Sequence, residues 1–443
     1  MTAANLKAIG IATFLHFLVD GLCVCSLYLM AGTATTTDML AFFLTYNILA
    51  FMTQPLTGWW VDRLYQKQAA LRIATSLLAT AIILLIAATL WWGLNSCSKI
   101  AVAILLGMGN SMFHVWGGKL TAILTDSDIR ALGIFVSTGV LGLTIGVLYA
   151  SWWLLLVMLL CIVLAAPSLP RPLQRRGEAI ALRNQQRGGA IPPSFGGVGG
   201  GFLLAILAFV MLRSFVGEVV PSEIEKTPDF LLLLAVTAMA GKACGGWIAS
   251  LWRISHAIVV CVGVTAACMI WKGTASIPSL PVFIGIFAIN LTMPMTLYLA
   301  NRLLPRREGL SFGLLAAVLI PGYFLAHNTS LTFNHHFMLS ALLLTISIEE
   351  GMLLLMGEKS KSVLMGAVAV NILTNVPLNY FLLTCGSTTE RLIAGELIVV
   401  AVEALWYFLF TRQWRKAAVY SMLCNATSFL VGILIQYLVY YSL

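Results

Sequence analysis

Runs of about 20 apolar residues recur along the whole chain, and each is long enough for one helix to cross a bilayer. The composition agrees, because 60% of the residues are hydrophobic and only 10% are charged. A soluble domain would carry roughly 25% charged residues. The sequence therefore predicts an all-α polytopic membrane protein.

Fifteen transmembrane helices are expected from these runs. The first has no small-residue cleavage site, so it is interpreted as a retained span and not as a signal peptide. The expected limits are 6–31, 38–61, 70–94, 98–123, 129–149, 151–168, 201–220, 229–250, 256–272, 279–301, 309–326, 337–357, 362–384, 390–410 and 417–440.

The basic residues gather in alternate loops, near 63–72, 171–187, 302–307, 359–361 and 412–416. The positive-inside rule then places the N-terminus in the cytoplasm, and an odd number of helices places the C-terminus outside. We expect a location in the cell (inner) membrane. The same rule accounts for the net charge of +9, so no nucleic-acid partner is expected. The nine cysteines are scattered, which predicts neither a disulfide framework nor a metal–thiolate site.

The chain is expected to have four parts. Residues 1–168 form an N-terminal six-helix bundle, and 169–200 form a basic linker rich in Gly and Pro. Residues 201–336 form a second bundle of five helices, which the helix at 337–357 could complete. Residues 337–443 form a four-helix module.

Two internal repeats support this division, because transporters are often built from repeats. The segment QPLTGWWVDR (54–63) in the first half matches KACGGWIASL (242–251) in the second. Three positions are aligned: Gln54 with Lys242, Gly58 with Gly246 and Asp62 with Ser250.

The second repeat lies in the last four helices. Glu349 precedes Asn371 by the same interval by which Glu403 precedes Asn425. We infer a duplicated helical hairpin. Its polar set is Glu349, Glu350, Asn371, Asn375, Glu403 and Asn425. These groups are expected to join the hairpins by hydrogen bonds. Binding of a proton or cation is the alternative.

His16 and Asp20 are spaced i, i+4 in the first expected helix and share one helical face. An aspartate beside a histidine inside a membrane can take up and release a proton. The charge of the Asp20 carboxylate would be neutralised by a proton or by a cationic substrate. The alternative is a hydrogen-bonded pair that holds the first helix to the fourth. Ionisable side chains inside membranes are functional by default, which favours coupling.

The fourth expected helix contains GMGNSMFHVWGGKL (107–120). Asn110 and His114 share a face with Gly107 and Gly118, so His114 is expected to face the His16–Asp20 pair. A packing histidine is the alternative. Lys119 is expected to extend to the cytoplasmic side. Asn47 and the deep-lying Arg213 are further candidates for substrate or proton contact.

Four segments carry a resemblance to a known family: HFLVD (16–20), TYNILAFMTQPLTGWWVDR (45–63), GMGNSMFHVWGGKL (107–120) and LRSFVGE (212–218). Together they make residues 6–326 resemble the major facilitator superfamily, and within it the fosmidomycin-resistance-like exporters. The chain departs from that branch at Val115 and Trp116, at the short LYQKQ run after Arg63, and at Ser250. The last four helices have no recognised counterpart.

The resemblance implies a two-bundle transporter that works by alternating access. Gly58, Asp62, Arg63, Lys242 and Gly246 would belong to its gating motif. We expect export of a small organic molecule in exchange for protons, with no cofactor beyond the proton gradient and no enzymatic activity. Two alternatives are an importer or transition-metal ion transporter that uses His16, Asp20 and His114, and a non-transporting scaffold or sensor built on the C-terminal module. The oligomeric state is left open.

Overall fold

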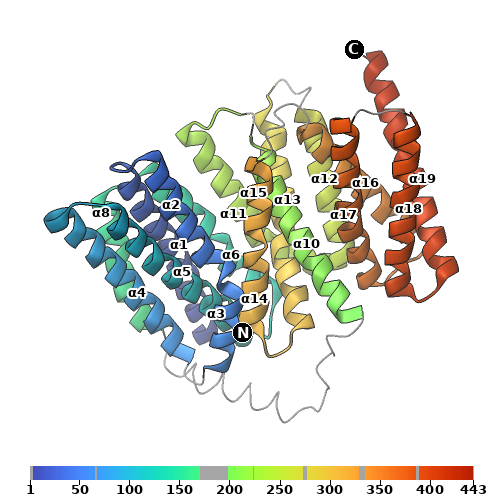
Figure 1. Cartoon of the computed structure of the whole chain (residues 1–443). Coiled ribbons are helices and arrows are strands. Elements are labelled where there is room, and N and C mark those ends of the chain that lie inside the picture. Colours follow the sequence, from blue (N-terminus) through green and yellow to red (C-terminus); the bar gives the residue numbers. More distant parts are fainter. Residues whose placement is uncertain are drawn as a thin grey trace, which may run out of the picture. The chain divides into compact units, whose positions relative to one another are not determined.

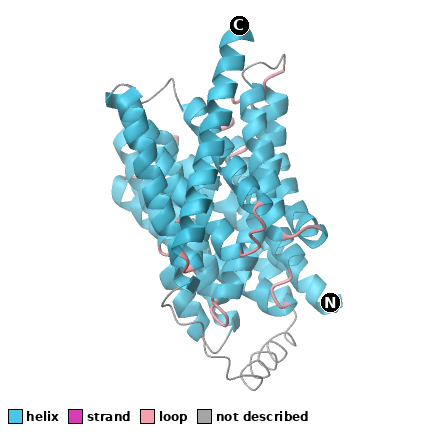
Figure 2. Cartoon of the chain, turned by 90° about the vertical axis from the view of Figure 1, so that its right-hand side faces the viewer, coloured by secondary structure: helices cyan, strands magenta, loops and turns pink. Residues whose placement is uncertain are grey.

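The structure is a computed structural model that describes residues 3–64, 67–169, 198–222, 224–272, 277–328, 335–385 and 389–442. The described residues contain helices and connecting turns but no strand (Figure 2). Most of the predicted linker at 169–200 lies outside them. The helices, all but α7 labelled in Figure 1, are α1 (Ala3–Ala31), α2 (Thr36–Asn47), α3 (Gln54–Arg63), α4 (Lys67–Ala87), α5 (Ser96–Thr125), α6 (Ile129–Ser137), α7 (Gly139–Leu148), α8 (Trp152–Ala165), α10 (Val198–Val219), α11 (Pro228–Leu251), α12 (Ile254–Lys272), α13 (Ser279–Leu303), α14 (Glu308–Ala317), α15 (Leu319–Asn328), α16 (His335–Leu355), α17 (Lys361–Cys385), α18 (Thr389–Thr411) and α19 (Trp414–Ser442).

Nine helices among the described residues are long and apolar enough to cross a membrane, and the bent pair α2–α3 would make ten. Many large apolar side chains on these helices are exposed, as a lipid-facing surface requires. Three shorter apolar helices occupy other predicted spans. The chain is thus a multi-pass membrane protein, and the count of fifteen spans stays a prediction.

Three expected helices are interrupted. The run at 38–61 contains a π-helical turn, Ile48–Met52, between α2 and α3, and this span bends by 42°. The runs at 129–149 and 309–326 are each divided into two helices, at Thr138 and at Val318. Apolar periodicity does not reveal such breaks, because both sides of a break are equally apolar.

One compact unit comprises 1–192, 225–250 and 293–320. Within it α1 packs against α5, α7 and α8. The contact with α7 is close because glycines face α1: a Cβ at Gly142 would overlap the backbone of Phe17, and one at Gly146 would overlap that of Gly21. Small residues at such spacing let two membrane helices approach closely.

The second unit comprises 193–224, 251–292 and 321–443. Within it α16 packs along α12, and α17 packs along α10. The helices α16–α19 share a small apolar core around Leu353, Ala367, Tyr407 and Cys424. The predicted division at 168, 200 and 336 follows the repeats of the sequence and stays a prediction.

Candidate functional site

Two histidines and an aspartate meet inside the first unit. His16 and Asp20 come from α1 and His114 from α5, and all three are at most 7% exposed. His16 Nε2 lies 3.3 Å from Asp20 Oδ2, and His114 Nε2 lies 3.3 Å from Asp20 Oδ1. The two Nε2 atoms are 2.8 Å apart. The i, i+4 spacing in α1 places His16 and Asp20 side by side, and the packing of α1 on α5 brings in His114.

The other ring nitrogens face backbone carbonyls. His16 Nδ1 is 2.8 Å from the oxygen of Phe135, and His114 Nδ1 is 3.0 Å from the oxygen of Asn110. A carbonyl only accepts hydrogen bonds, so both Nδ1 atoms must carry hydrogen. In neutral rings both Nε2 atoms would then be acceptors, facing each other and the Asp20 carboxylate.

This arrangement lacks one hydrogen between its acceptor atoms. The Asn110 amide donates to Asp20 Oδ1 at 3.1 Å, but it is neutral. A proton on His16 or His114 would supply the hydrogen for the 2.8 Å contact and would neutralise the carboxylate. An unneutralised buried carboxylate is costly. The site therefore has the chemistry of a proton-binding cluster.

The candidates predicted from sequence have different positions. Asn110 and His114 meet the His16–Asp20 pair, and Lys242 of α11 lies within electrostatic range of His114. Asn47 instead donates to Phe43 of its own helix. Arg213 is buried in the second unit.

Gly107 and Gly118 do not contact the cluster in the described packing. A Cβ at Gly107 would meet Tyr46 and Leu49, and one at Gly118 would meet Phe312 of α14. These two glycines let neighbouring helices approach α5, as small residues do in membrane bundles.

Two contributors were missed from the sequence. Phe135 at the C-terminal end of α6 supplies the carbonyl that fixes the His16 tautomer, and its ring stacks on His16 with centroids 4.9 Å apart. At Gly139, a Cβ would collide with Asp20 Oδ2 and His16 Nε2. The spacing of Gly139, Gly142 and Gly146 in one apolar run was a usable signal for a close helix contact.

The gating candidate Asp62 binds the start of another helix. Its carboxylate accepts hydrogen bonds from the backbone N–H groups of Gly309, at 3.0 Å, and Leu310, at 2.9 Å. These are among the N–H groups at the N-terminus of α14, which has no side-chain cap from its own N-cap residue. Asp62 thus caps α14 from α3.

Lys119 extends toward the Asp62 turn, but its side chain ends in a buried ion pair and not in water. Its Nζ lies 3.1 Å from Asp62 Oδ1 and donates to the carbonyl of Val61 at 2.9 Å, and its side chain is only 10% exposed. A long side chain extends to water when no buried acceptor is in reach, but here Asp62 provides one. Arg63, by contrast, stacks over the ring of Trp59 at 3.4 Å.

The second copy of this turn is organised differently. Gly246 of α11 packs on the backbone of Arg130 at the start of α6. The residue four positions later, Ser250, donates to Trp247 of its own helix. The cap of α6 comes from Asp128, which accepts from the Arg130 N–H at 2.9 Å. A helix that caps itself needs no aspartate from α11.

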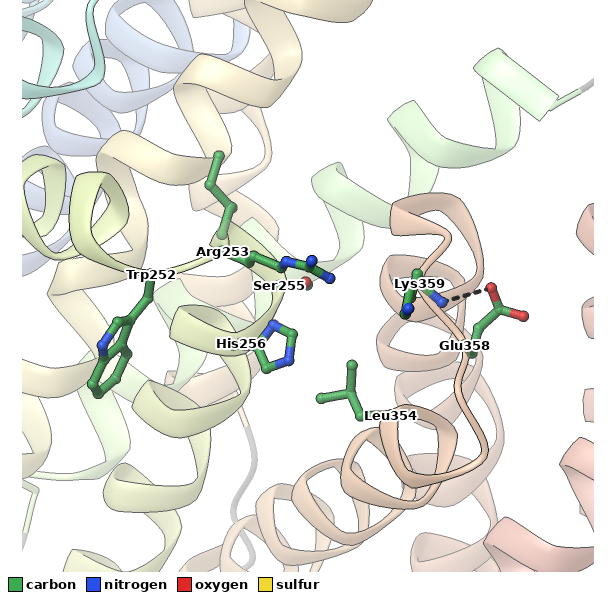
Figure 3. A pocket seen from close by; sticks show the side chains of 8 residues that line it. Trp252, Arg253, Ser255, His256, Leu354, Glu358 and Lys359 are labelled. Atoms are coloured by element: carbon green, nitrogen blue, oxygen red, sulfur yellow. Dashed lines mark hydrogen bonds between the residues drawn. The ribbon is translucent and has the colours of Figure 1, made fainter.

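A cavity of 430 Å³ lies in the second unit at the loops before α12 and after α16. Figure 3 shows Arg253 and His256 on one side of it and Leu354 and Lys359 on the other. The Glu358 carboxylate accepts hydrogen bonds from Lys416 at 2.8 Å and Tyr420 at 2.7 Å, so its charge is already balanced. The other charged side chains of the lining, Arg253 and Lys359, are basic and favour an anion over a cation.

The sequence matches no protein-family model and no curated protein. Two solved structures are similar in fold. A crystal structure of the E. coli fucose:proton symporter FucP, in a single-substitution variant, aligns with a TM-score of 0.54 and 11% identity, over 84% of this chain and 99% of that one. A crystal structure of FucP in the outward conformation aligns with a TM-score of 0.53 and 11% identity, over the same shares.

The chain has the major facilitator fold. The resemblance found in sequence is confirmed at that level. Identity of 11% carries the fold alone, so substrate and direction are not transferred. The His16–Asp20–His114 cluster joins α1, α5 and α6, which belong to the first, fourth and fifth expected helices. The Asp62 contact joins α3, in the second expected helix, to α14, in the eleventh.

Proposed function

We propose that this protein is a proton-coupled secondary active transporter that works by alternating access and exports a small organic molecule. The observation that carries the proposal is the cluster of His16, Asp20 and His114, which needs one proton to satisfy its geometry. Structures of this fold include a proton symporter, which favours transport over a scaffold role.

The coupling follows from charge balance in a buried site. When the cluster holds a proton, the imidazolium and the Asp20 carboxylate neutralise each other. When the proton leaves, the Asn110 amide is the one hydrogen-bond donor to Asp20 that remains among the described residues. The deprotonated carboxylate is then stabilised by water or by a cationic group of the substrate. Proton and substrate therefore compete for one charge, as exchange requires.

The Asp62 contact supplies a gate for this cycle. Asp62 holds the start of α14 against the end of α3, and Gly58 and Gly246 let two helix pairs close backbone to backbone. By the predicted orientation these contacts lie on the cytoplasmic side. Opening them would expose the cluster to the cytoplasm, and closing them would leave access from outside.

Export, and a small organic substrate, are proposed from the resemblance to the fosmidomycin-resistance-like branch. The test is growth of an efflux-deficient bacterium that expresses the protein, across a panel of toxic organic compounds with fosmidomycin included. We expect protection against one compound class. Asp20→Asn should abolish it, and Asp229→Asn, an exposed carboxylate at the start of α11, should not.

Two outcomes would contradict this proposal. Protection that survives Asp20→Asn would remove the cluster from the coupling mechanism. No protection, or greater sensitivity, with membrane levels equal to a functional control would contradict export and favour uptake. Proteoliposomes with a trapped pH dye then decide whether any compound that is moved also moves protons.

A transition-metal substrate is the second candidate, because one ligand atom from each of His16, Asp20 and His114 lies within 4.8 Å of the others. The 2.8 Å separation of the Nε2 atoms is a hydrogen-bond distance. Two nitrogens bound tetrahedrally to zinc would be about 3.3 Å apart. The observed arrangement thus favours the proton. Metal-dependent thermal stabilisation that is lost in His114→Ala would reverse the order of the two candidates.

A further inference from the structure

A second buried acidic cluster lies in α16–α19, within the second unit. Glu349 and Glu403 are both 0% exposed. Asn371 donates to Glu349 Oε2 at 2.8 Å, and Asn425 donates to Glu403 Oε2. Each hairpin, α16–α17 and α18–α19, therefore contains the same glutamate–asparagine hydrogen bond.

The two hairpins also exchange contacts reciprocally. Thr374, just after Asn371 in α17, lies 3.1 Å from Glu403 Oε1 in the other hairpin. Ser428, at the same spacing after Asn425, lies 3.2 Å from Glu349 Oε1. The sequence offset that relates the two glutamates also relates these hydroxyl groups. The duplicated hairpins pack on each other as two copies related by a pseudo-twofold axis, like the subunits of an isologous dimer.

The hydroxyl hydrogens are too few for the acceptors around them. Thr374 Oγ1 faces both Glu403 and the carbonyl of Val370, at 2.8 Å. Ser428 Oγ faces both Glu349 and the carbonyl of Asn425, at 3.1 Å. A hydroxyl has one hydrogen, and a carbonyl has none to give. If the hydroxyl donates to the carbonyl, the glutamate must donate to the hydroxyl. A protonated carboxyl group satisfies every contact in both hairpins.

A proton fits this site better than a metal ion. The Asn371 amide donates to Glu349 and to the Ala367 carbonyl, and its oxygen accepts from Asn375. This fixes the amide with its hydrogens toward the carboxyl group. Hard cations need oxygen ligands, and here the amide oxygen is turned away. All described hydrogen-bond partners of the Glu349 and Glu403 carboxyl groups are neutral amides and hydroxyls.

Unpartnered polar groups next to the pair point the same way. Among the described residues, the Tyr407 hydroxyl and Glu350 Oε1 are buried without a hydrogen-bond partner. Tyr407 is one turn after Glu403 and interacts electrostatically with Glu349 and Glu403. Its hydroxyl is a spare donor for a carboxyl group that has lost its proton.

Among the described residues, the titratable groups that act on this pair are all acidic. They come from α16, α18 and α19, whereas α17 contributes the neutral Asn371 and Thr374. They are Glu350, Glu396, Tyr407 and Cys424. No opposite charge among them compensates two buried carboxylates.

We propose that the C-terminal four-helix module is a proton-binding unit that holds one proton on Glu349 and one on Glu403. With both protons bound, the carboxyl groups donate across the hairpin interface. When both protons pass to water, the two buried carboxylates repel each other. The lone pairs of each carboxylate then face those of a hydroxyl oxygen. The interface between the hairpins is therefore strongest in acid and weakens as the pH rises. This site is distinct in residues and in fold from the His16–Asp20–His114 cluster.

The experiment is infrared spectroscopy of the purified full-length protein in lipid nanodiscs, with glutamate carboxyl carbons labelled with ¹³C. The labelled carboxylic-acid band at neutral pH should fall by one carboxyl equivalent in Glu349→Gln and in Glu403→Gln, and by two in the double variant. Glutamine can donate to the hydroxyl as the acid does, so these variants should fold. Glu396, a half-buried glutamate on α18, provides the matched control. Glu396→Gln should not change the part of the acid band that Glu349 and Glu403 contribute.

The wild-type protein gives a second readout. Its unfolding temperature should fall over the pH interval in which the acid band disappears, and the double variant should lose that pH dependence. An acid band equal in wild type and double variant would overturn the proposal. The proposal would also be overturned if sodium stabilised the wild-type protein more than choline does and the double variant lacked this difference. Asp20→Asn should leave the labelled band unchanged, so failure of the transport proposal is a separate result.

Discussion

Gly58 and Gly246 occupy matching positions of the two repeated segments, and each packs against the start of another helix. Gly58 meets the backbone of Gly309 in α14, and Gly246 meets that of Arg130 in α6. A Cβ at either position would overlap main-chain atoms, which cannot move aside as a flexible side chain can. The repeat visible in the sequence thus corresponds to a repeated contact between helices.

The two contacts differ in capping, and this gives a rescue prediction. Asp128→Ala should remove the cap of α6 and lower stability by about 1 kcal/mol. Ser250→Asp places a carboxylate where Asp62 stands in the other copy, so it should recover most of that loss. Thermal unfolding of both single variants and the double variant measures this. Equal losses in Asp128→Ala and the double variant would show that the two turns are not equivalent.

Asp62→Asn should destabilise the contact between α3 and α14 because Lys119 would keep a buried charge without its partner. The expected loss is roughly 1–3 kcal/mol, read from thermal unfolding. Removing both charges, with Lys119→Met added, should be less harmful than Asp62→Asn alone. Additive losses would instead show that the ion pair contributes nothing beyond its separate hydrogen bonds.

Gly139→Ala should damage the proton-binding cluster because its Cβ would collide with Asp20 and His16. We expect a stability loss of roughly 1–3 kcal/mol, as for other overpacked sites. Any proton-coupled flux should fall about tenfold, the equivalent of about 1.4 kcal/mol in the barrier. Gly10→Ala is the control, since nothing lies within 4 Å of a Cβ there. Normal flux in folded Gly139→Ala would place the cluster outside the transport mechanism.

Glu358 predicts a pH dependence opposite to that of the Glu349–Glu403 pair. Burial disfavours its charged form, but hydrogen bonds from Lys416, the Ser360 N–H and Tyr420 outweigh this and hold its pKa below the usual value. A lowered carboxyl pKa adds stability above the unfolded-state pKa, and that stability is lost as the pH falls through the folded-state value.

The stability difference between wild type and Glu358→Gln should therefore be full at neutral pH and shrink below about pH 4. Thermal unfolding across this range measures it. Glu390→Gln, an exposed glutamate at the start of α18, should behave like wild type. A difference that grows in acid would contradict the assignment.

Truncation separates the roles of the last four helices. A chain ending at residue 336 loses α16 and α17, which pack along α12 and α10, so it should aggregate. A chain ending at residue 388 keeps both helices and should yield more monodisperse protein in size-exclusion chromatography. Equal, well-behaved yields would show that α16 and α17 are accessory to the core.

The sequence alone determined the class of the protein and much of its helix order. Runs of about 20 apolar residues have the length of one membrane-crossing helix, in which all backbone hydrogen bonds lie within the segment. The Asp62–Arg63 turn after Gly58 indicated the superfamily whose fold the structure shows. The i, i+4 spacing of His16 and Asp20, and the face shared by Asn110 and His114, are local properties of a helix. They could be read directly.

Only the tertiary structure decided which groups meet. The carbonyl of Phe135 fixes the His16 tautomer and Gly139 makes room for the cluster, yet both lie in later helices, far from His16 in the sequence. The buried ion pair of Lys119 could not be read from the sequence because its partner, Asp62, belongs to a different helix, α3. Helical periodicity determines which side chains share a face. The partner of that face is set by helix packing, which a single sequence does not encode locally.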